Sequence, residues 1–401
     1  MNAKTIRQDF PMFRDPSNQV IYLDNAATTQ KPEALIRRIV DYYSGENANI
    51  HRGSYPLSNR ASQSYEAARE AVRQWIGAKH KTEIVFTKSS TEVVNLLSSV
   101  LFHTHLCPGD NVVTTELEHS SNYFPWKAHC REAGVEFRAA RAEPDGTLPA
   151  ENVLRIIDDR TKLVAITGMS NVTGFRPDLE TIISCAHSKK AIVYVDAAQM
   201  IAHENVSVSQ LDCDLLGFSA HKCYGPMGVG VMYGKRELLE SLSPYLYGGD
   251  MVIRREGGAI GYKTDPGKYE AGTQNIEGVL ALEAALAYLA RNHFPELCRE
   301  ELLCAGYLRE GLRQMKGVTV LGADDPSPIL SFTMNGLDSY DIGVLLGQRG
   351  ISVRSGAHCA YPLLERMEKE STVRVSLGIY NTRDEIDLLL DELKKLASIR
   401  Q

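Results

Sequence analysis

Short apolar runs alternate with longer amphipathic stretches between about residue 80 and residue 235. Seven of these runs have the length and the branched or aromatic composition of buried β-strands. They cover residues 83–87, 111–115, 135–140, 162–167, 191–196, 214–219 and 228–234. Strands that alternate with helices predict a mainly parallel seven-stranded sheet with helices on both faces. Because ligands of such sheets gather at the carboxyl ends of the strands, the polar residues that follow these runs are the first candidates for a site.

The remaining chain predicts a second, smaller unit of helices and short strands. Helices are expected over 59–77 and 276–292, and a last helix is expected near Thr382, where Thr382 and Glu385 form a capping box. Short strands are expected over 318–322, 329–334, 351–355 and 372–376. We therefore expect an α/β protein with three parts. These are an N-terminal segment 1–20 packed on the small domain, a large domain 21–275, and an α+β C-terminal domain 276–401.

Composition narrows the class of protein. The chain has 401 residues, 43% of them hydrophobic and 23% charged, which suits a large globular enzyme. Its net charge is −6 and no basic block stands out, which argues against nucleic acid as a partner. No apolar segment is long enough to span a membrane, and the first residues lack a signal-peptide pattern. Eight cysteines without a C-x-x-C pair predict a reduced, cytoplasmic protein without a metal site.

The segment FSAHKCYGPMGVG, residues 218–230, carries the first chemical signal. Lys222 follows a predicted buried strand, where loss of solvation lowers a lysine's pKa and leaves a neutral amine able to bond a carbonyl cofactor. Asp196 ends the preceding strand in the same way, with Gln199 close behind. Pyridoxal phosphate (PLP) needs a lysine for its aldehyde and an acid for its ring nitrogen. The two strand ends together therefore predict a PLP site.

Ten segments in order along the chain carry a family resemblance. They are YLDNAATTQKP (22–32), NIHRGSYPLSNRAS (49–62), STEVVN (90–95), LEHSSNYFPW (117–126), SNVTG (170–174), VDAAQ (195–199), FSAHKCYGPMG (218–228), YEAGTQN (269–275), RSGAHCA (354–360) and VRVSLGIYNT (373–382). The chain thereby resembles the group II cysteine desulfurases of aminotransferase class V. The resemblance runs nearly end to end, and it implies the fold of the fold-type I PLP-dependent transferases.

The resemblance assigns residues to the cofactor. Those expected to bind it are Ser90, Thr91, His119, Asp196, Gln199, Ser219, His221, Lys222 and Thr273. His119 is expected to stack on the pyridine ring, and Gln199 to hydrogen-bond the phenolic oxygen. Ser90, Thr91, Ser219 and His221 are expected at the phosphate. Thr273 is expected to reach the phosphate of a neighbouring subunit, so the resemblance implies a homodimer.

Other residues are assigned to the substrate and to catalysis. Asn171 and Arg374 resemble the pair that holds the substrate carboxylate, a task that suits the planar fork of arginine. Arg354 is a further candidate, and His51 and Arg52 match a segment that enters the site from the partner subunit. Cys359 matches the family nucleophile, and the positive residues beside it favour thiolate. Ala357 departs from the polar residue often found at its position.

The function implied is that of a homodimeric L-cysteine desulfurase. Lys222 would remove the Cα proton, and the Cys359 thiolate would take the substrate sulfur as a persulfide. L-alanine would leave after protonation helped by Lys222 or His119. The sulfur would pass to an acceptor protein, which the sequence does not identify, for assembly of iron–sulfur clusters or other sulfur cofactors. Selenocysteine lyase (with L-selenocysteine as substrate), cysteine-sulfinate lyase and another class V aminotransferase remain alternatives.

Overall fold

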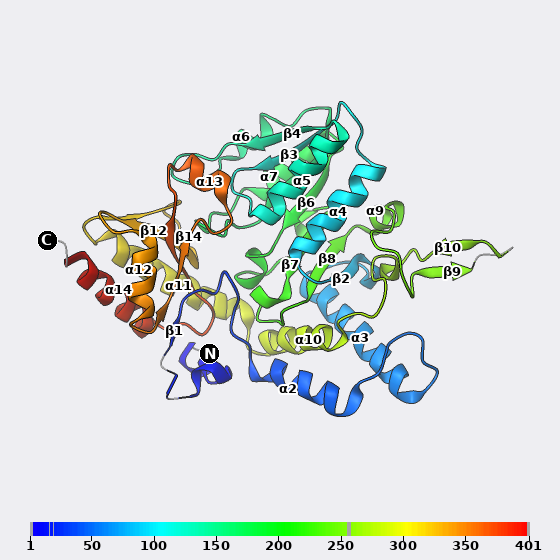
Figure 1. The fold of residues 1–401 in the computed structure, drawn as a ribbon, viewed down its shortest axis with the longest axis horizontal. Coiled ribbons are helices and arrows are strands. Elements are labelled where there is room, and N and C mark those ends of the chain that lie inside the picture. The colour runs from blue at the N-terminus through cyan, green and yellow to red at the C-terminus, as the bar shows by residue number, and fades with distance from the viewer. Residues whose placement is uncertain (1–2, 16, 19, 255–257, 399–401) are drawn as a thin grey trace.

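A mainly parallel sheet of seven strands forms the centre of the molecule (Figure 1). The computed structural model describes residues 3–15, 17–18, 20–254 and 258–398. The strand order is β2-β8-β7-β6-β5-β3-β4, and β8 alone runs against its neighbours. The strands are β2 (Ile84–Thr87), β3 (Asn111–Thr115), β4 (Glu136–Ala140), β5 (Thr161–Thr167), β6 (Ile192–Asp196), β7 (Leu215–Ser219) and β8 (Gly230–Gly234). All seven predicted strands are present within two residues, so the α/β class is confirmed.

Both faces of this sheet are buried. Side chains of a strand point alternately to opposite faces, so Ile84 and Phe86 enter one apolar core while Val85 enters the other. Because both faces are covered, the central strands are apolar at almost every position instead of alternating with polar residues. Helices that cover the faces include α3 (Pro56–Trp75), α4 (Ser90–Thr104), α5 (Ser120–Ala133), α7 (Leu179–Ser188) and α10 (Ile276–Arg291).

The C-terminal part contains a four-stranded antiparallel sheet in the order β11-β12-β15-β14. Its strands are β11 (Val318–Val320), β12 (Ile329–Met334), β15 (Thr372–Ser376) and β14 (Arg354–Gly356). The prediction of one strand over 351–355 is wrong, because the run changes partner at Val353. β13 (Ile351–Ser352) pairs with β1 (Ile21–Tyr22), whereas β14 pairs with β15. Helices α11 (Phe294–Arg313), α12 (Ser339–Gly347) and α14 (Arg383–Ser398) accompany this sheet.

The three predicted helix starts can be checked against the structure, and α10 begins at Ile276 as predicted. α3 begins at Pro56, three residues before the predicted start, because proline has the backbone angle of a first helical turn and needs no donor there. The capping box of α14 is confirmed. The Thr382 N–H donates to Glu385 at 2.9 Å, and the Glu385 N–H donates to Thr382 Oγ1 at 3.4 Å.

The N-terminal segment lies against elements that are distant in sequence. Phe10 packs on the rings of Tyr224, Tyr288 and Tyr380, and Arg7 pairs with Glu385 at 2.9 Å. The remaining elements are α1 (Ala3–Arg7), α2 (Glu33–Asp41), α6 (Ala150–Leu154), α8 (Val208–Leu211), α9 (Arg236–Ser241), α13 (Tyr361–Arg366), β9 (Val252–Arg254) and β10 (Ile260–Tyr262).

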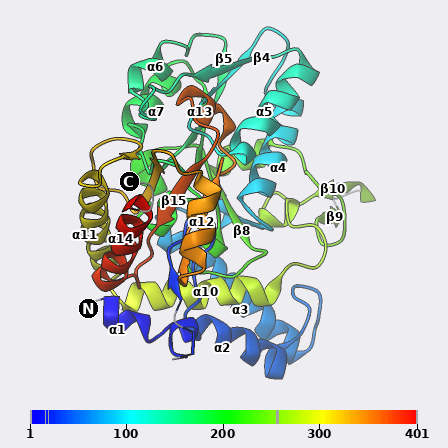
Figure 2. The ribbon, with the colours of Figure 1, turned by 60° about the vertical axis from the view of Figure 1, so that its left-hand side comes forward.

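Two features of the outer surface stand out in the views. The β9–β10 hairpin projects from the body (Figure 1), and α2 runs beside α10 along the base (Figure 2). Among the described residues, no helix is both long and apolar enough to cross a membrane.

Candidate active site

A cavity of about 290 Å³ opens where the central strands end. Strands β6 and β7, the starts of α4 and α5, and the loop after β14 all contribute to its wall. Twelve of the fifteen predicted site residues line it. They are Ser90, Thr91, His119, Asn171, Asp196, Gln199, Ser219, His221, Lys222, Arg354, Cys359 and Arg374. The topology thus brings together residues that lie up to 284 positions apart in sequence (374 − 90).

Lys222 and Asp196 face this cavity from adjacent parallel strands. Asp196 ends β6 opposite Gly217 of β7, and Lys222 closes the short helical turn Ala220–Lys222 that follows β7. Burial lowers the pKa of Lys222 to about 8, although the Asp196 carboxylate opposes this shift. Burial raises the pKa of Asp196, while the Ala198 N–H stabilises its charged form by donating to Oδ1 at 3.0 Å. The pair therefore offers a lysine amine that deprotonates easily beside an acid.

One end of the cavity is suited to an anion. The first turn of α4 presents backbone N–H groups and the positive end of the helix dipole. The Ser90 N–H donates to Ser219 Oγ at 2.8 Å, and the Ser219 hydroxyl donates to Ser90 Oγ at 2.9 Å. The helix cap is Ser89, whose Oγ accepts from the Glu92 N–H. The hydroxyls of Ser90 and Ser219 are thus held in place at the start of the helix.

Several buried polar atoms of the cavity residues have no hydrogen-bond partner within the described part of the chain. They are Asn171 Oδ1, Gln199 Oε1, His221 Nδ1, His358 Nδ1 and Arg374 Nε. Buried polar groups of folded proteins are nearly always paired, so their gathering around one cavity indicates a polar ligand. PLP, with a phosphate, a phenolic oxygen and a ring nitrogen, fits this donor and acceptor set.

His119 forms the N-cap of α5 beside the cavity. Its Nδ1 accepts the Ser121 N–H at 3.1 Å, which places the proton of the neutral ring on Nε2. Burial lowers the pKa of His119 to about 4, and the charges of Lys222 and Arg374 add to the effect. At neutral pH the ring is therefore an uncharged imidazole with an N–H to donate.

Two arginines converge on Asp24, a residue that the sequence analysis did not single out although it lies within YLDNAATTQKP. The Arg374 Nη2 donates to Asp24 at 3.1 Å, and Arg354 Nε donates to both of its carboxylate oxygens at 3.2 Å. Arg374 is buried and also donates to the Asn171 carbonyl at 2.9 Å, whereas Arg354 is about half exposed. The carboxylate thus orients two guanidinium groups at one side of the cavity.

The loop that carries Cys359 is hydrogen-bonded to Ser120 and Asn171, two residues that follow strands of the large sheet. The Cys359 carbonyl accepts from the N–H and the hydroxyl of Ser120, both at 2.7 Å. The Asn171 Nδ2 donates to the His358 carbonyl at 2.8 Å, which links the Asn171 amide to the loop and leaves its second N–H available. His358 and Cys359 both have positive φ angles, 53° and 54°. These contacts hold an exposed thiol at the cavity.

Cys223, directly after Lys222, offers no comparable nucleophile. It is fully buried, and burial raises the pKa of its thiol to about 12. Burial likewise raises the pKa of Cys130 and Cys213 to about 12. Since the thiolate is the reactive form, these three cysteines are inert by environment. No cluster of metal-ligating side chains occurs among the described residues.

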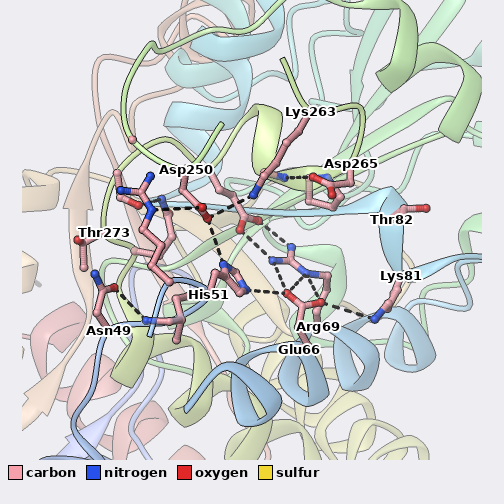
Figure 3. Close-up of a pocket in the computed structure, with 18 residues that line it drawn as sticks. Asn49, His51, Glu66, Arg69, Lys81, Thr82, Asp250, Lys263, Asp265 and Thr273 are labelled. Carbon is pink, nitrogen blue, oxygen red and sulfur yellow. Dashed lines mark hydrogen bonds and ion pairs between the residues drawn. The ribbon is translucent and has the colours of Figure 1, made fainter. Parts of the chain in front are cut away.

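The other three predicted site residues, His51, Arg52 and Thr273, line a second cavity of about 470 Å³ (Figure 3). His51 lies between Asp250 and Glu66, with its Nδ1 3.3 Å from Asp250 Oδ2. Arg52 also contacts Asp250, at 3.4 Å. None of the three lines the cavity of Lys222 within the same chain.

Comparison with known proteins identifies the family. The aminotransferase class-V model matches residues 21–389. The chain belongs to aminotransferase class V.

Within class V, the chain is similar to cysteine desulfurases along its whole length. It is 39% identical to one from Pectobacterium carotovorum, over 98% of this chain and 97% of the relative. The solved cysteine desulfurase CsdA from Escherichia coli, in an S-sulfonic acid form, superposes with a TM-score of 0.92 at 35% identity, covering 100% and 99% of the two chains. That of Thermococcus onnurineus NA1 superposes at 0.94 with 34% identity, covering 99% and 98%. The fold-type I transferase fold expected from the sequence is confirmed, and the class V protein is a member of an enzyme family.

Proposed function

We propose that this class V enzyme is a PLP-dependent L-cysteine desulfurase that forms L-alanine and a persulfide on Cys359. The observation that carries the proposal is the meeting of three groups in one cavity. They are the amine of Lys222, the carboxylate of Asp196 and the exposed thiol of Cys359. An aminotransferase requires the first two but has no use for a thiol fixed at the cavity.

Lys222 would hold PLP covalently, and Asp196 would pair its ring nitrogen. When bound, PLP acts as an electron sink for the substrate's Cα. His119 would lie on the ring and Gln199 at the phenolic oxygen. The phosphate would be held by Ser90, Thr91, Ser219 and His221, which surround the start of α4.

The chain's own residues would then act in a defined order. Asn171 and Arg374, with Arg354, would hold the substrate carboxylate. The Lys222 amine would take the Cα proton, a role that its lowered pKa supports. The Cys359 thiolate would attack the substrate sulfur, forming an S–S bond as the Cβ–S bond breaks. Lys222 or the Nε2–H of neutral His119 would return a proton, and L-alanine would leave.

The complete enzyme would be a homodimer in the cytoplasm. Thr273, His51 and Arg52, whose cavity is separate from that of Lys222, would complete the partner's site. The chain would comprise a segment 1–20, a PLP domain 21–275 and a small domain 276–401 that carries the Cys359 loop. The persulfide sulfur would pass to an acceptor protein for iron–sulfur cluster or other sulfur-cofactor assembly.

Mass spectrometry tests the nucleophile directly. After brief exposure to L-cysteine, the peptide that contains Cys359 is expected to carry one added sulfur. Cys359→Ala is expected to keep the cofactor and to lose alanine production, whereas Cys107→Ala, which alters another exposed cysteine, is expected to keep both. If Cys359→Ala still releases alanine from L-cysteine at the native rate, the proposal fails. Activity of that variant on L-selenocysteine or cysteine sulfinate alone would indicate a lyase.

A further inference from the structure

The segment Thr28–Lys31, part of a motif to which the proposed function gives no role, converges on one backbone carbonyl. The His221 carbonyl belongs to the peptide group that joins His221 to Lys222. It accepts from Lys31 Nζ at 2.8 Å, from Thr28 Oγ1 at 3.1 Å, and from Thr29 through its N–H at 3.1 Å and its hydroxyl at 3.2 Å. Four donors aimed at one oxygen constrain the peptide group immediately before Lys222.

Lys31 has no other evident task. It is partly buried, and its remaining contacts are the hydroxyls of Thr28 and Thr29, at 3.5 and 3.4 Å. Within the described part of the chain, no carboxylate forms an ion pair with Lys31. Burial lowers the pKa of Lys31 to about 7, with the Cys223 thiol opposing the shift, yet the nitrogen keeps N–H groups to donate in either form. Burying an amine is costly unless it is hydrogen-bonded, so its retention at this carbonyl calls for a function.

We infer that Lys31 is a positioning residue for Lys222: with Thr28 and Thr29 it fixes the His221 carbonyl and thereby sets where the Lys222 amine stands in the cavity. The inference rests on the proposed function, in which Lys222 bonds PLP. The turn's own hydrogen bonds go to Ala220, whose carbonyl accepts from the N–H groups of Cys223 and Gly225 at 2.9 Å. The peptide between His221 and Lys222 is therefore held from outside the turn, by the 28–31 segment.

The rate at which added PLP attaches to Lys222 in cofactor-free protein tests the inference. Attachment joins the aldehyde carbon to Nζ with loss of water. It is followed by visible absorbance and, after borohydride reduction, by the mass of the Lys222 peptide. Lys31→Met keeps the side-chain length without the donor and is expected to slow attachment about tenfold, which is the order of one hydrogen bond's contribution. Thr28→Val removes a neutral donor at nearly constant shape, and a smaller slowing is expected. Lys394→Met, on the exposed face of α14, is the control.

A second comparison separates positioning from general damage to the site. In a Lys222→Ala background PLP binds without the covalent bond, and adding Lys31→Met is expected to leave that affinity unchanged. If Lys31→Met weakens PLP binding equally with Lys222 present and with Lys222→Ala, the inference is overturned. Attachment of PLP at the native rate in both Lys31→Met and Thr28→Val would overturn it as well. If Lys31→Met does not fold, Thr28→Val decides alone. Failure of the unsubstituted protein to attach PLP at Lys222 would instead refute the proposed function.

Discussion

At the scale of single residues, burial determines which protonation states the cavity contains. Burial lowers the pKa of His119 and His221 to about 4 and that of His358 to about 3. All three rings are therefore neutral at neutral pH, and each takes up a proton more readily when the chain unfolds. His358 is the one of the three without a proposed role at the cofactor or the substrate. Its Nε2 lies 2.8 Å from Thr372 Oγ1 behind the Cys359 loop.

His358→Gln is expected to reduce the loss of stability of the cofactor-free protein in acid. The folded-state pKa of His358 is below its unfolded value of about 6.5, so its stabilisation is complete above that pH and declines as pH falls. Between about pH 7 and pH 5, the histidine accounts for a loss of about 1–2 kcal/mol in the free energy of unfolding. Urea unfolding of both proteins at pH 7 and at pH 5 measures this loss in the free energy of unfolding. Glutamine can keep the hydrogen bond to Thr372.

The exposed His103 provides the matched control for this measurement. His103→Gln is expected to show the same pH dependence as the unsubstituted protein. An unchanged pH dependence in His358→Gln would mean that His358 is protonated in the fold or neutral in both states. In that case burial of the His358 ring would not lower its pKa in the folded protein.

At the scale of elements, the loop between β14 and α13 owes its shape to backbone angles that side chains disfavour. Gly356 has φ +122°, a region accessible essentially to glycine, and His358 and Cys359 follow with positive φ angles. An added Cβ at Gly356 would also lie 2.9 Å from the Tyr340 hydroxyl. The Cys359 thiol is thus presented by a loop whose geometry begins at this glycine.

Gly356→Ala is therefore expected to destabilise the loop by about 1–3 kcal/mol and to slow persulfide formation while PLP binding persists. Alanine production, persulfide mass and the cofactor spectrum measure the three effects. Gly347→Ala is the control, because Gly347 lies in helix α12 with open space around its Cα. It is expected to be neutral or slightly stabilising. Equal persulfide formation in both variants would show that the loop's angles do not control the thiol.

The elements also show how far sequence reasoning extends. Continuous apolar runs predict the seven central strands because both faces of that sheet are buried, and strand ends predict Asp196 and Lys222 because parallel sheets bind ligands there. Contacts between distant residues leave no such local trace. The division of 351–355 between β1 and β15, the bond from Asn171 to the Cys359 loop, and the pairing of Asp24 with two arginines all depend on which partner lies opposite in space.

At the scale of the whole molecule, the predicted site residues divide between two cavities of one chain. Thr273 and the His51–Arg52 pair line the cavity shown in Figure 3, while Lys222 and Cys359 line the other. Thr273 lies in segment 269–275, the strap, which is anchored through Glu270. The Glu270 carboxylate accepts from Arg69 at 2.7 Å and 2.8 Å, and both side chains are buried. A rigid strap away from its own chain's lysine is what a site shared between two chains requires.

A heterodimer with Lys222→Ala in one chain and Thr273→Ala in the other tests this sharing. If Thr273 serves the partner's cofactor, both defects fall in the same site and the second site is complete. About half of the native activity is then expected, with PLP covalently attached at one site per dimer. The control is a dimer with both substitutions in one chain and none in the other; each of its sites then carries one defect, and activity is expected to fall well below half. If these two outcomes were exchanged, Thr273 would act within its own chain, and the two cavities would have to be connected by movement of the strap instead of by dimerisation.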